Sequence, residues 1–374
     1  MSALRLPSPT LIKATALGAA AIAAGVLLLQ PAAKPPAPPG PHSGDIPLHK
    51  AWPRAALSAG QNGVLDQDNT TYTPRLYLNP GLSIGIARTP DGEWLRVLLR
   101  NADGSTHELR RLHGAGSPSF NGFTPAGDQV VWAETVAGTG TTQKTSIWRA
   151  NWRTFAVSPL VADAGSATFR KSGNDIVVAG GQVHWLTGGN IKHLPAALHS
   201  VPLTGGTVTS KPVPTLLSLT TWPWLSTAEA SVSVAATLYR ADTGKRQTVS
   251  TTPAETVKCT PAWCLVGVAG ATGTTRLDAM RPNGTDRHRI AGPDTAPVLN
   301  DVAIADRFQP LGIAATDNSG TVTLQVVDLT KRQTVRVASG VAVVEAQGTM
   351  LWWAVGRPGR EYTWYALDLA TVPA

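Results

Sequence analysis

The sequence lacks the signatures of the common enzyme classes. It contains no His-Glu-x-x-His, no Gly-x-Ser-x-Gly, no phosphate-binding loop and no Cys-x-x-Cys pair. Its eight histidines are dispersed, and no metal-ligand spacing is visible among them. We therefore expect no metal and no cofactor, and the sequence favours a binding protein over an enzyme.

Charge is also scarce, and it is scattered along the chain. Charged residues make up 15% of the 374 residues, and 32 Lys and Arg against 24 Asp and Glu give a formal net charge of +8. Because no basic stripe is present, we exclude nucleic acid as a partner. The excess of positive charge instead favours an anionic envelope polymer or a lipid surface.

Long helices are not expected in the body of the chain. Its 36 Gly and 29 Pro interrupt the sequence throughout, which is typical of many short strands joined by turns. The N-terminus is the exception, since an uncharged run, 14–29, follows Arg5 and Lys13. This run predicts one transmembrane signal-anchor helix or, as the alternative, a signal peptide cleaved near residues 31–33.

Three segments are expected. Residues 1–30 form the signal anchor or signal peptide, residues 31–71 a Pro-rich linker and irregular segment, and residues 72–374 a β-propeller. Positive charge before the apolar run stays in the cytoplasm, so the propeller lies outside it. We expect a single-pass protein of the cell membrane, or a secreted protein if the segment is cleaved.

The two cysteines, Cys259 and Cys264, lie in one hairpin-like stretch. Four residues separate them, between two strand-like runs. An exported protein meets oxidising conditions, so we predict a structural disulfide at the tip of a hairpin. Closing so short a loop contributes about 2 kcal/mol in the chain-entropy model.

A repeat extends over the body of the chain, with a period of about 44 residues. Two clear units read LRVLLRNADGSTHELRRL, from Leu95, and TRLDAMRPNGTDRHRIAG, from Thr275: a strand, a polar turn and a second strand. Turn residues recur at Asp103, Asn151, Gly205, Asp242, Asn283, Asp328 and Asp368. Such a period is typical of four-stranded blades, so we predict an all-β, seven-bladed β-propeller, with six blades as the alternative. We expect residues 74–79 to close the ring by adding an outer strand to the last blade.

These two units resemble the repeat of TolB-like propellers, in which an acidic or Asn-Gly turn leads into an Arg-rich outer strand. TPDGEW, from Thr89, and FTPAGDQVVW, from Phe123, resemble the turn that precedes an apolar strand in that family. The resemblance implies a propeller of the cell envelope whose usual role is interaction. The αβ domain that precedes the repeats in TolB itself is missing, so its partners are not transferred. The single anchor, the C-x4-C hairpin, LWW near the C-terminus and the preference for Arg over Lys resemble membrane-anchored propellers of actinobacteria.

Twelve tryptophans are the remaining candidates for function. Most are expected between blades, but neighbouring positions on a strand point to opposite faces, so some rings are expected at the surface. The candidate binding residues are Trp222, Trp224, Trp352 and Trp353, with Trp222-Pro223-Trp224 preferred.

The sequence thus predicts a noncatalytic, membrane-tethered propeller that binds a protein or an envelope polymer. The alternatives are a propeller-type enzyme, such as a glycan lyase or hydrolase acting at the central channel, and a subunit that stabilises a membrane complex. Carboxylates with shifted pKa at one channel mouth would favour the enzyme. For Asp301 and Asp306, with Arg307, we expect a structural ion pair between blades.

Overall fold

The computed structural model describes residues 45–374, except 116, 138–142, 189–194, 228–234, 271–272 and 358–360. The predicted signal anchor and residues 31–44 of the predicted linker lie outside this part of the chain. Within it the helices are α2 (Leu48–Ala51) and the 3-10 turn η1 (Leu369–Thr371). Neither is long and apolar enough to cross a membrane.

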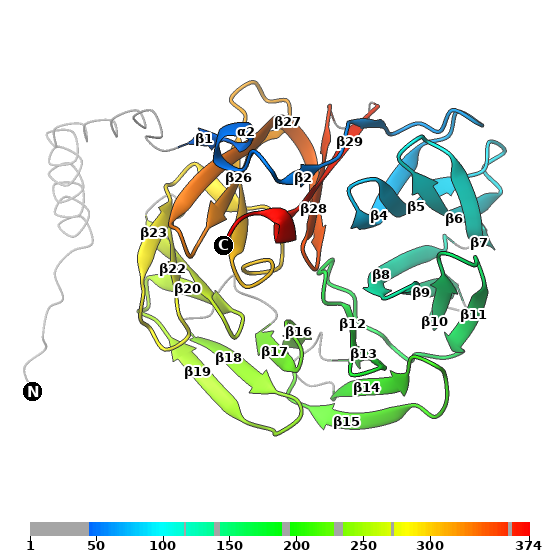
Figure 1. Ribbon diagram of the computed structural model, residues 1–374. Helices are drawn as coiled ribbons and strands as arrows, with labels where there is room; N and C mark the ends of the chain where they lie inside the picture. Colours follow the sequence, from blue (N-terminus) through cyan, green and yellow to red (C-terminus); the bar gives the residue numbers. More distant parts are fainter. Residues whose placement is uncertain are drawn as a thin grey trace, which may run out of the picture. The chain divides into compact units, whose positions relative to one another are not determined.

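The rest of the described chain folds into antiparallel sheets arranged in a ring (Figure 1). Five sheets have four strands each, taken consecutively from the sequence, as in a β-propeller. Their strands are β4 (Tyr72–Asn79), β5 (Leu82–Arg88), β6 (Trp94–Asn101) and β7 (Thr106–His113); β8 (Ser119–Ala126), β9 (Gln129–Ala137), β10 (Gln143–Asn151) and β11 (Val157–Val161); β12 (Ile176–Ala179), β13 (Gln182–Thr187), β14 (Ala196–Pro202) and β15 (Thr209–Val213); β16 (Leu217–Leu219), β17 (Trp224–Thr227), β18 (Ala235–Arg240) and β19 (Arg246–Ser250); β20 (Glu255–Cys259), β21 (Cys264–Gly270), β22 (Gly273–Met280) and β23 (His288–Ala291).

A sixth sheet has nine strands because one strand, β27 (Gln333–Gln347), runs through two units of the ring. Its first part pairs with β26 and its second part, from Val341, pairs with β28. Gly340 precedes the change of partner and has a φ of +67°, which residues with a side chain rarely adopt. The other strands of this sheet are β24 (Thr295–Pro297), β25 (Phe308–Ala314), β26 (Val322–Asp328), β28 (Met350–Val355), β29 (Thr363–Asp368), β1 (Ile46–Pro47), β2 (Ala56–Leu57) and β3 (Gln61–Asn62).

The predicted turn residues follow or end the third strand of successive units. Between β6 and β7, the Asp103 carboxylate accepts hydrogen bonds from the amide and the hydroxyl of Ser105, at 2.9 and 2.7 Å. Asn283 does the same for Thr285 between β22 and β23, at 3.1 and 2.7 Å. A short polar side chain that binds the backbone two residues later fixes such a turn, so the period found in the sequence is the period of this hairpin.

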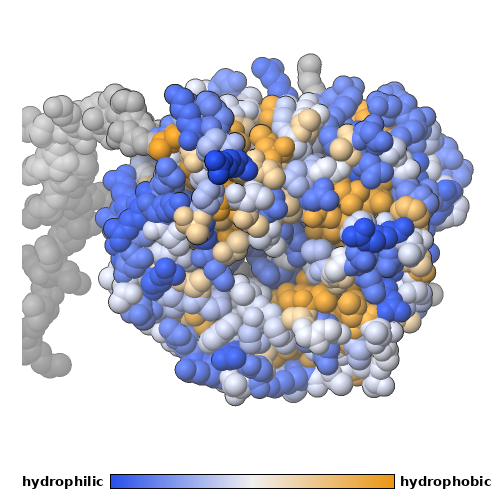
Figure 2. All heavy atoms as spheres, viewed as in Figure 1, coloured by the Kyte–Doolittle hydropathy of each residue, from blue (hydrophilic) through white to orange (hydrophobic). Residues whose placement is uncertain are grey.

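Apolar cores lie between neighbouring sheets. One core joins Leu76 and Val97 of the first sheet to Trp132 of the second, and all three side chains are fully buried. The same pattern recurs around the ring and ends at a core that joins Tyr77 of β4 to Trp352 of β28. In Figure 2 polar residues dominate the periphery and apolar ones gather inside the ring. Each sheet therefore depends on its neighbours for burial.

The ring is closed by strands that precede β4 in the chain. Both β2 and β3 pair antiparallel with β29, and the Ser58 amide donates to the Ala366 carbonyl oxygen at 2.8 Å. The prediction that residues 74–79 add the closing strand is wrong, because these residues belong to β4 and pair with β5. β4 is an inner strand because Leu76 and Tyr77, which point to opposite faces, are both buried. The predicted boundary at residue 72 thus leaves out strands that belong to the sheets.

Removing the closing strands tests their contribution. A chain that lacks residues 1–63 loses β1 to β3 and Trp52, whose ring packs edge-on against Phe308 at 5.7 Å. Since the loss of a buried Trp side chain alone costs about 3–5 kcal/mol, we expect the free energy of unfolding to fall by at least about that amount in urea titrations. A chain that lacks only residues 1–44 is the control. Equal stability of the two truncated chains would contradict this account of closure.

Candidate functional site

Residues 169–175, the last part of the connection from β11 to β12, are called here the axial segment. Its anchor is Asp301, in the connection between β24 and β25. The Asp301 carboxylate accepts hydrogen bonds from the Ser172 hydroxyl at 2.6 Å, the Gly173 amide at 2.8 Å and the Asn174 side-chain amide at 3.1 Å. Two sheets separate β12 from β24 along the ring. These hydrogen bonds therefore join two connections that belong to sheets that are not neighbours in the ring.

A second carboxylate, that of Asp175 at the end of the axial segment, accepts hydrogen bonds from backbone amides of the same segment. Its two oxygens accept hydrogen bonds from the Arg170 amide, each at 2.9 Å, and one also accepts from the Ser172 amide at 3.2 Å. Burial raises the pKa of Asp175 to about 6, against the opposing effect of these backbone donors. The negative charge of Asp301 adds to the rise in pKa.

The axial segment also packs closely against β27. A Cβ atom on Gly173 would lie 2.7 Å from the Gln347 side-chain oxygen and 2.9 Å from the Ala346 carbonyl oxygen, so only glycine fits. Gln347 in turn donates to the Thr124 hydroxyl of β8 at 3.1 Å. Strands of two different sheets, β27 and β8, are therefore linked beside this segment.

A cavity of about 510 Å³ lies between the axial segment and the inner strands β4, β8 and β27. Four aromatic rings line it together with Arg75 and Glu345; they are Phe120, Phe123, Phe169 and Trp352. The Arg75 guanidinium lies 3.5 Å from the Glu345 carboxylate and joins β4 to β27 across the point of ring closure. Burial raises the pKa of Glu345, although the charge of Arg75 acts in the opposite direction.

Of the predicted binding residues, Trp352 and Trp353 lie in the interior. Their side chains are 1% and 2% exposed. Trp352 packs against Tyr77 at 5.7 Å between ring centres, and Trp353 stacks on Tyr365 at 5.8 Å. The two rings point to opposite faces of β28, as expected from strand geometry, but both faces are covered by neighbouring elements.

Trp222 and Trp224 lie at the β16–β17 turn and are both partly exposed. The Trp222 ring stacks on His184 of β13 with 3.7 Å between ring centres. It borders a cavity of about 310 Å³ whose lining includes Ser200 and Lys211. Trp224 lies under the Arg240 guanidinium, at 5.8 Å, and packs against the core between the fourth and fifth sheets.

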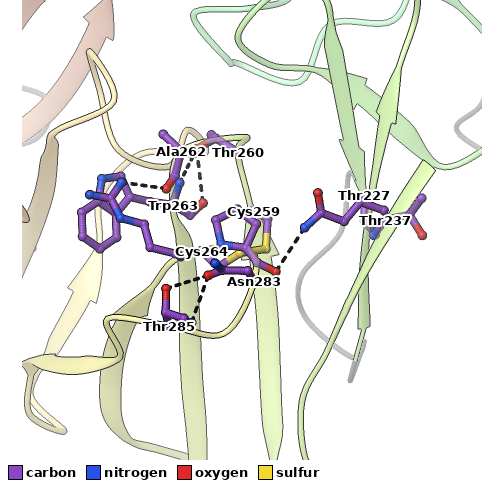
Figure 3. The surroundings of a disulfide bond; sticks show 12 residues. Thr227, Thr237, Cys259, Thr260, Ala262, Trp263, Cys264, Asn283 and Thr285 are labelled. Atoms are coloured by element: carbon purple, nitrogen blue, oxygen red, sulfur yellow. Dashed lines mark hydrogen bonds between the residues drawn. A yellow bond between two sulfur atoms is a disulfide. The ribbon is translucent and has the colours of Figure 1, made fainter. Parts of the chain in front are cut away.

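The predicted disulfide between Cys259 and Cys264 is present at the tip of the β20–β21 hairpin (Figure 3). Inside the loop that it closes, the Thr260 hydroxyl donates to the Trp263 carbonyl oxygen and accepts from the Trp263 amide, each at 3.2 Å. Trp263 is fully buried. The disulfide therefore fixes a loop that also supplies a core side chain.

The remaining sequence candidates have structural partners. Arg307 pairs with Asp328, at 2.5 Å, and the prediction that it pairs with Asp301 or Asp306 is wrong. The cause is that Asp328, at the end of β26, is fully buried and needs a cation, whereas Asp301 faces the axial segment. Among the described residues, no group of three His, Cys, Asp or Glu is placed to hold a metal ion. One of the eight histidines, His193, lies outside the described residues.

Sequence reasoning does not single out Arg75, Asp175 or Glu345. One signal was present, because Glu345 is an isolated charge in the apolar run VAVVEA of β27. Because a buried charge needs a polar partner, a charged residue in an apolar strand indicates that polar groups lie beside it in the interior. Neither Arg75 nor Asp175 carries a local mark of this kind.

No protein-family model and no curated protein matches the chain. Among solved structures it is similar to a puromycin-hydrolyzing peptidase of Mycobacterium tuberculosis, with 13% identity, a TM-score of 0.52, and 88% of this chain and 55% of that chain covered. It is also similar to the β-propeller domain of the Trilobed protease of Pyrococcus furiosus (12% identity, TM-score 0.46, 66% and 82% covered) and to a putative TolB of Agrobacterium tumefaciens (15% identity, TM-score 0.39, 70% and 94% covered). The chain thus spans about half the length of the first of these, and the likeness is one of fold, to the β-propellers.

The pKa of Asp175 predicts how stability depends on pH. Because its pKa is about 6 in the folded state and about 4 in the unfolded state, the folded state binds more protons between these values. The free energy of unfolding should then fall as pH rises from about 4 to 6, by at most about 1.4 kcal/mol per pH unit. We expect this slope to be reduced in Asp175→Asn and kept in the control Asp294→Asn, at an exposed residue, when urea titrations are repeated across the range. Identical pH profiles for wild type and Asp175→Asn would refute the assignment.

Proposed function

We propose that this chain is a noncatalytic, extracytoplasmic β-propeller, tethered to the membrane by its N-terminal segment, that binds a protein or a polymer of the cell envelope. The proposal rests on one observation, namely that the Asp301 and Asp175 carboxylates bind groups of the axial segment. Asp301 and Asp175 accept six hydrogen bonds from the axial segment, so their role is to hold that segment in place. Binding of a protein or a polymer is then left to the surface.

Seven blades are the count that the pairing supports best. The nine-stranded sheet divides at β27 into one unit of β24 to β26 with the first part of β27, and one of its second part with β28, β29 and the closing strands. Added to the five four-stranded sheets, these two units correspond to the seven turn residues of the sequence. A count of six blades would require both parts of β27 to belong to one blade, although they pair with different strands.

The proposed location outside the cytoplasm is supported by the disulfide. The pair Cys259–Cys264 accounts for both cysteines of the chain, and bonds of this kind persist in oxidising compartments. The apolar run 14–29 supplies the export signal in this proposal.

The surface around Trp222 is the preferred contact site. A partly exposed indole already stacked on His184 loses little conformational freedom on binding and offers a large apolar face. The adjoining cavity adds the hydroxyl of Ser200 and the ammonium group of Lys211 as polar groups. Such a combination is typical of interface anchors.

Replacement of Trp222 tests this surface. The tethered wild-type protein, Trp222→Ala and Trp94→Ala are used to capture partners from the native envelope and compared by quantitative mass spectrometry. Trp94 is the matched control, since it is also partly exposed and contacts a histidine ring, His113, at 5.1 Å. We expect Trp222→Ala to lower the recovery of the main partner about 30-fold, in line with the loss of an anchor residue, and Trp94→Ala to leave it unchanged. Equal recovery by folded Trp222→Ala would place the contact site elsewhere.

One observation favours the second candidate function, a propeller-type glycan lyase or hydrolase. Asp175 and Glu345 line the same cavity, and both have raised pKa values. Raised carboxyl pKa values near neutrality are typical of general acids. Asp175 is already held by backbone donors, so Glu345 would be the acid in this case.

An assay of glycan cleavage distinguishes the two functions. We expect the full-length protein to release no new reducing ends or unsaturated products from isolated envelope polysaccharides. Release that Glu345→Gln lowers about 100-fold or more, and that the exposed control Glu93→Gln leaves unchanged, would replace the binding proposal by the enzyme.

A further inference from the structure

A second cavity, of about 350 Å³, borders the axial segment where it faces β16, β17 and β20. Its lining is rich in hydroxyl groups, and its apolar wall includes Phe169, Leu219 and Val302. The Trp222 surface and the Arg75–Glu345 pair are not part of it. A cavity of this volume suits a small molecule rather than a polymer chain.

Two cations enter this cavity, Arg170 from the axial segment and Lys258 from β20. Burial lowers the pKa of Lys258, the negative charge of Asp301 raises it, and the positive charge of Arg170 lowers it, so these three charged groups lie close together. The nearest carboxylate is that of Asp301, whose oxygens already accept three hydrogen bonds from the axial segment. The residues that line the cavity therefore carry one more positive than negative charge.

Two buried polar atoms of this cavity lack a hydrogen-bond partner. They are Nε of Arg170 and Oγ of Ser226, and the Ser226 residue is 3% exposed. A buried donor without a partner is costly, and a bound oxyanion is a group that would satisfy it. Lys258 contributes its ammonium group, which also donates to the Asn300 carbonyl oxygen.

We propose that this cavity binds the oxyanion of a small molecule, a phosphate or a carboxylate, between Arg170 and Lys258, with the Ser226 hydroxyl as a further donor. An oxyanion balances the excess positive charge and accepts from both orphaned groups. Arginine and lysine hold such anions through strong, charge-assisted hydrogen bonds. Trp222 itself does not line this cavity.

The test is calorimetric titration of the full-length protein in detergent with sodium phosphate and, separately, with sodium acetate. Ionic strength is kept constant with sodium chloride, so that a general salt effect gives no signal. We expect saturable binding of at least one of the two anions, and the tighter one identifies the ligand as a phosphate or a carboxylate. Arg170→Gln and Lys258→Gln should each weaken this binding about 10-fold or more.

Two further variants separate binding from folding. Ser226→Ala removes an unpaired hydroxyl, so it should leave the unfolding temperature unchanged or higher while it weakens anion binding about 3-fold or more. Lys245→Gln makes the same charge change as Lys258→Gln at an exposed residue and should bind the anion as wild type does. Absence of saturable binding by the wild type, or wild-type affinity in folded Ser226→Ala and Lys258→Gln, overturns the proposal.

Discussion

The packing of each sheet against the next is the interaction on which the rest of this structure depends. The sheets are too thin to bury their apolar faces alone, and the cores lie between neighbours rather than within a sheet. A row of such sheets would leave one apolar face exposed at each end. The contact between Tyr77 of the first sheet and Trp352 of the last removes both exposed faces at once. Closure into a ring is thus a consequence of burial, and the pairing of β2 and β3 with β29 secures it.

A closed ring has a centre that backbone ladders do not fill. In this protein the axial segment fills part of it, held by Asp301 from across the ring and by Asp175 from within. Desolvated carboxylates are stable there only because backbone and side-chain donors point at them. The cavities that remain on the two sides of this segment have different linings. One contains an ion pair between Arg75 and Glu345, and the other an excess of positive charge with unsatisfied donors.

Buried and partly exposed tryptophans lie in different parts of this fold. Trp352 and Trp353 lie on one strand, β28, whose two faces are both covered by neighbouring elements, whereas Trp222 lies on a turn and is partly exposed. The fold therefore accounts for why two adjacent tryptophans in a strand make poor binding candidates in a propeller. Both faces of its inner strands are covered, so alternation along a strand does not bring one face to solvent.

Much of the fold was readable from local sequence, because its causes are local. The Asp103 and Asn283 turns, the strands beside them and the Cys259–Cys264 hairpin each depend on residues within a few positions of one another. The closing strand was assigned to the wrong residues, since β2 and β3 have two residues each and carry no periodic pattern. The centre of the ring was decided by tertiary structure alone. Ser172 and Asp301 are 129 positions apart, and Arg75 and Glu345 meet only when the first and last sheets do. Sequence determines which strands form, whereas the groups that share a cavity depend on how the ring brings distant strands together.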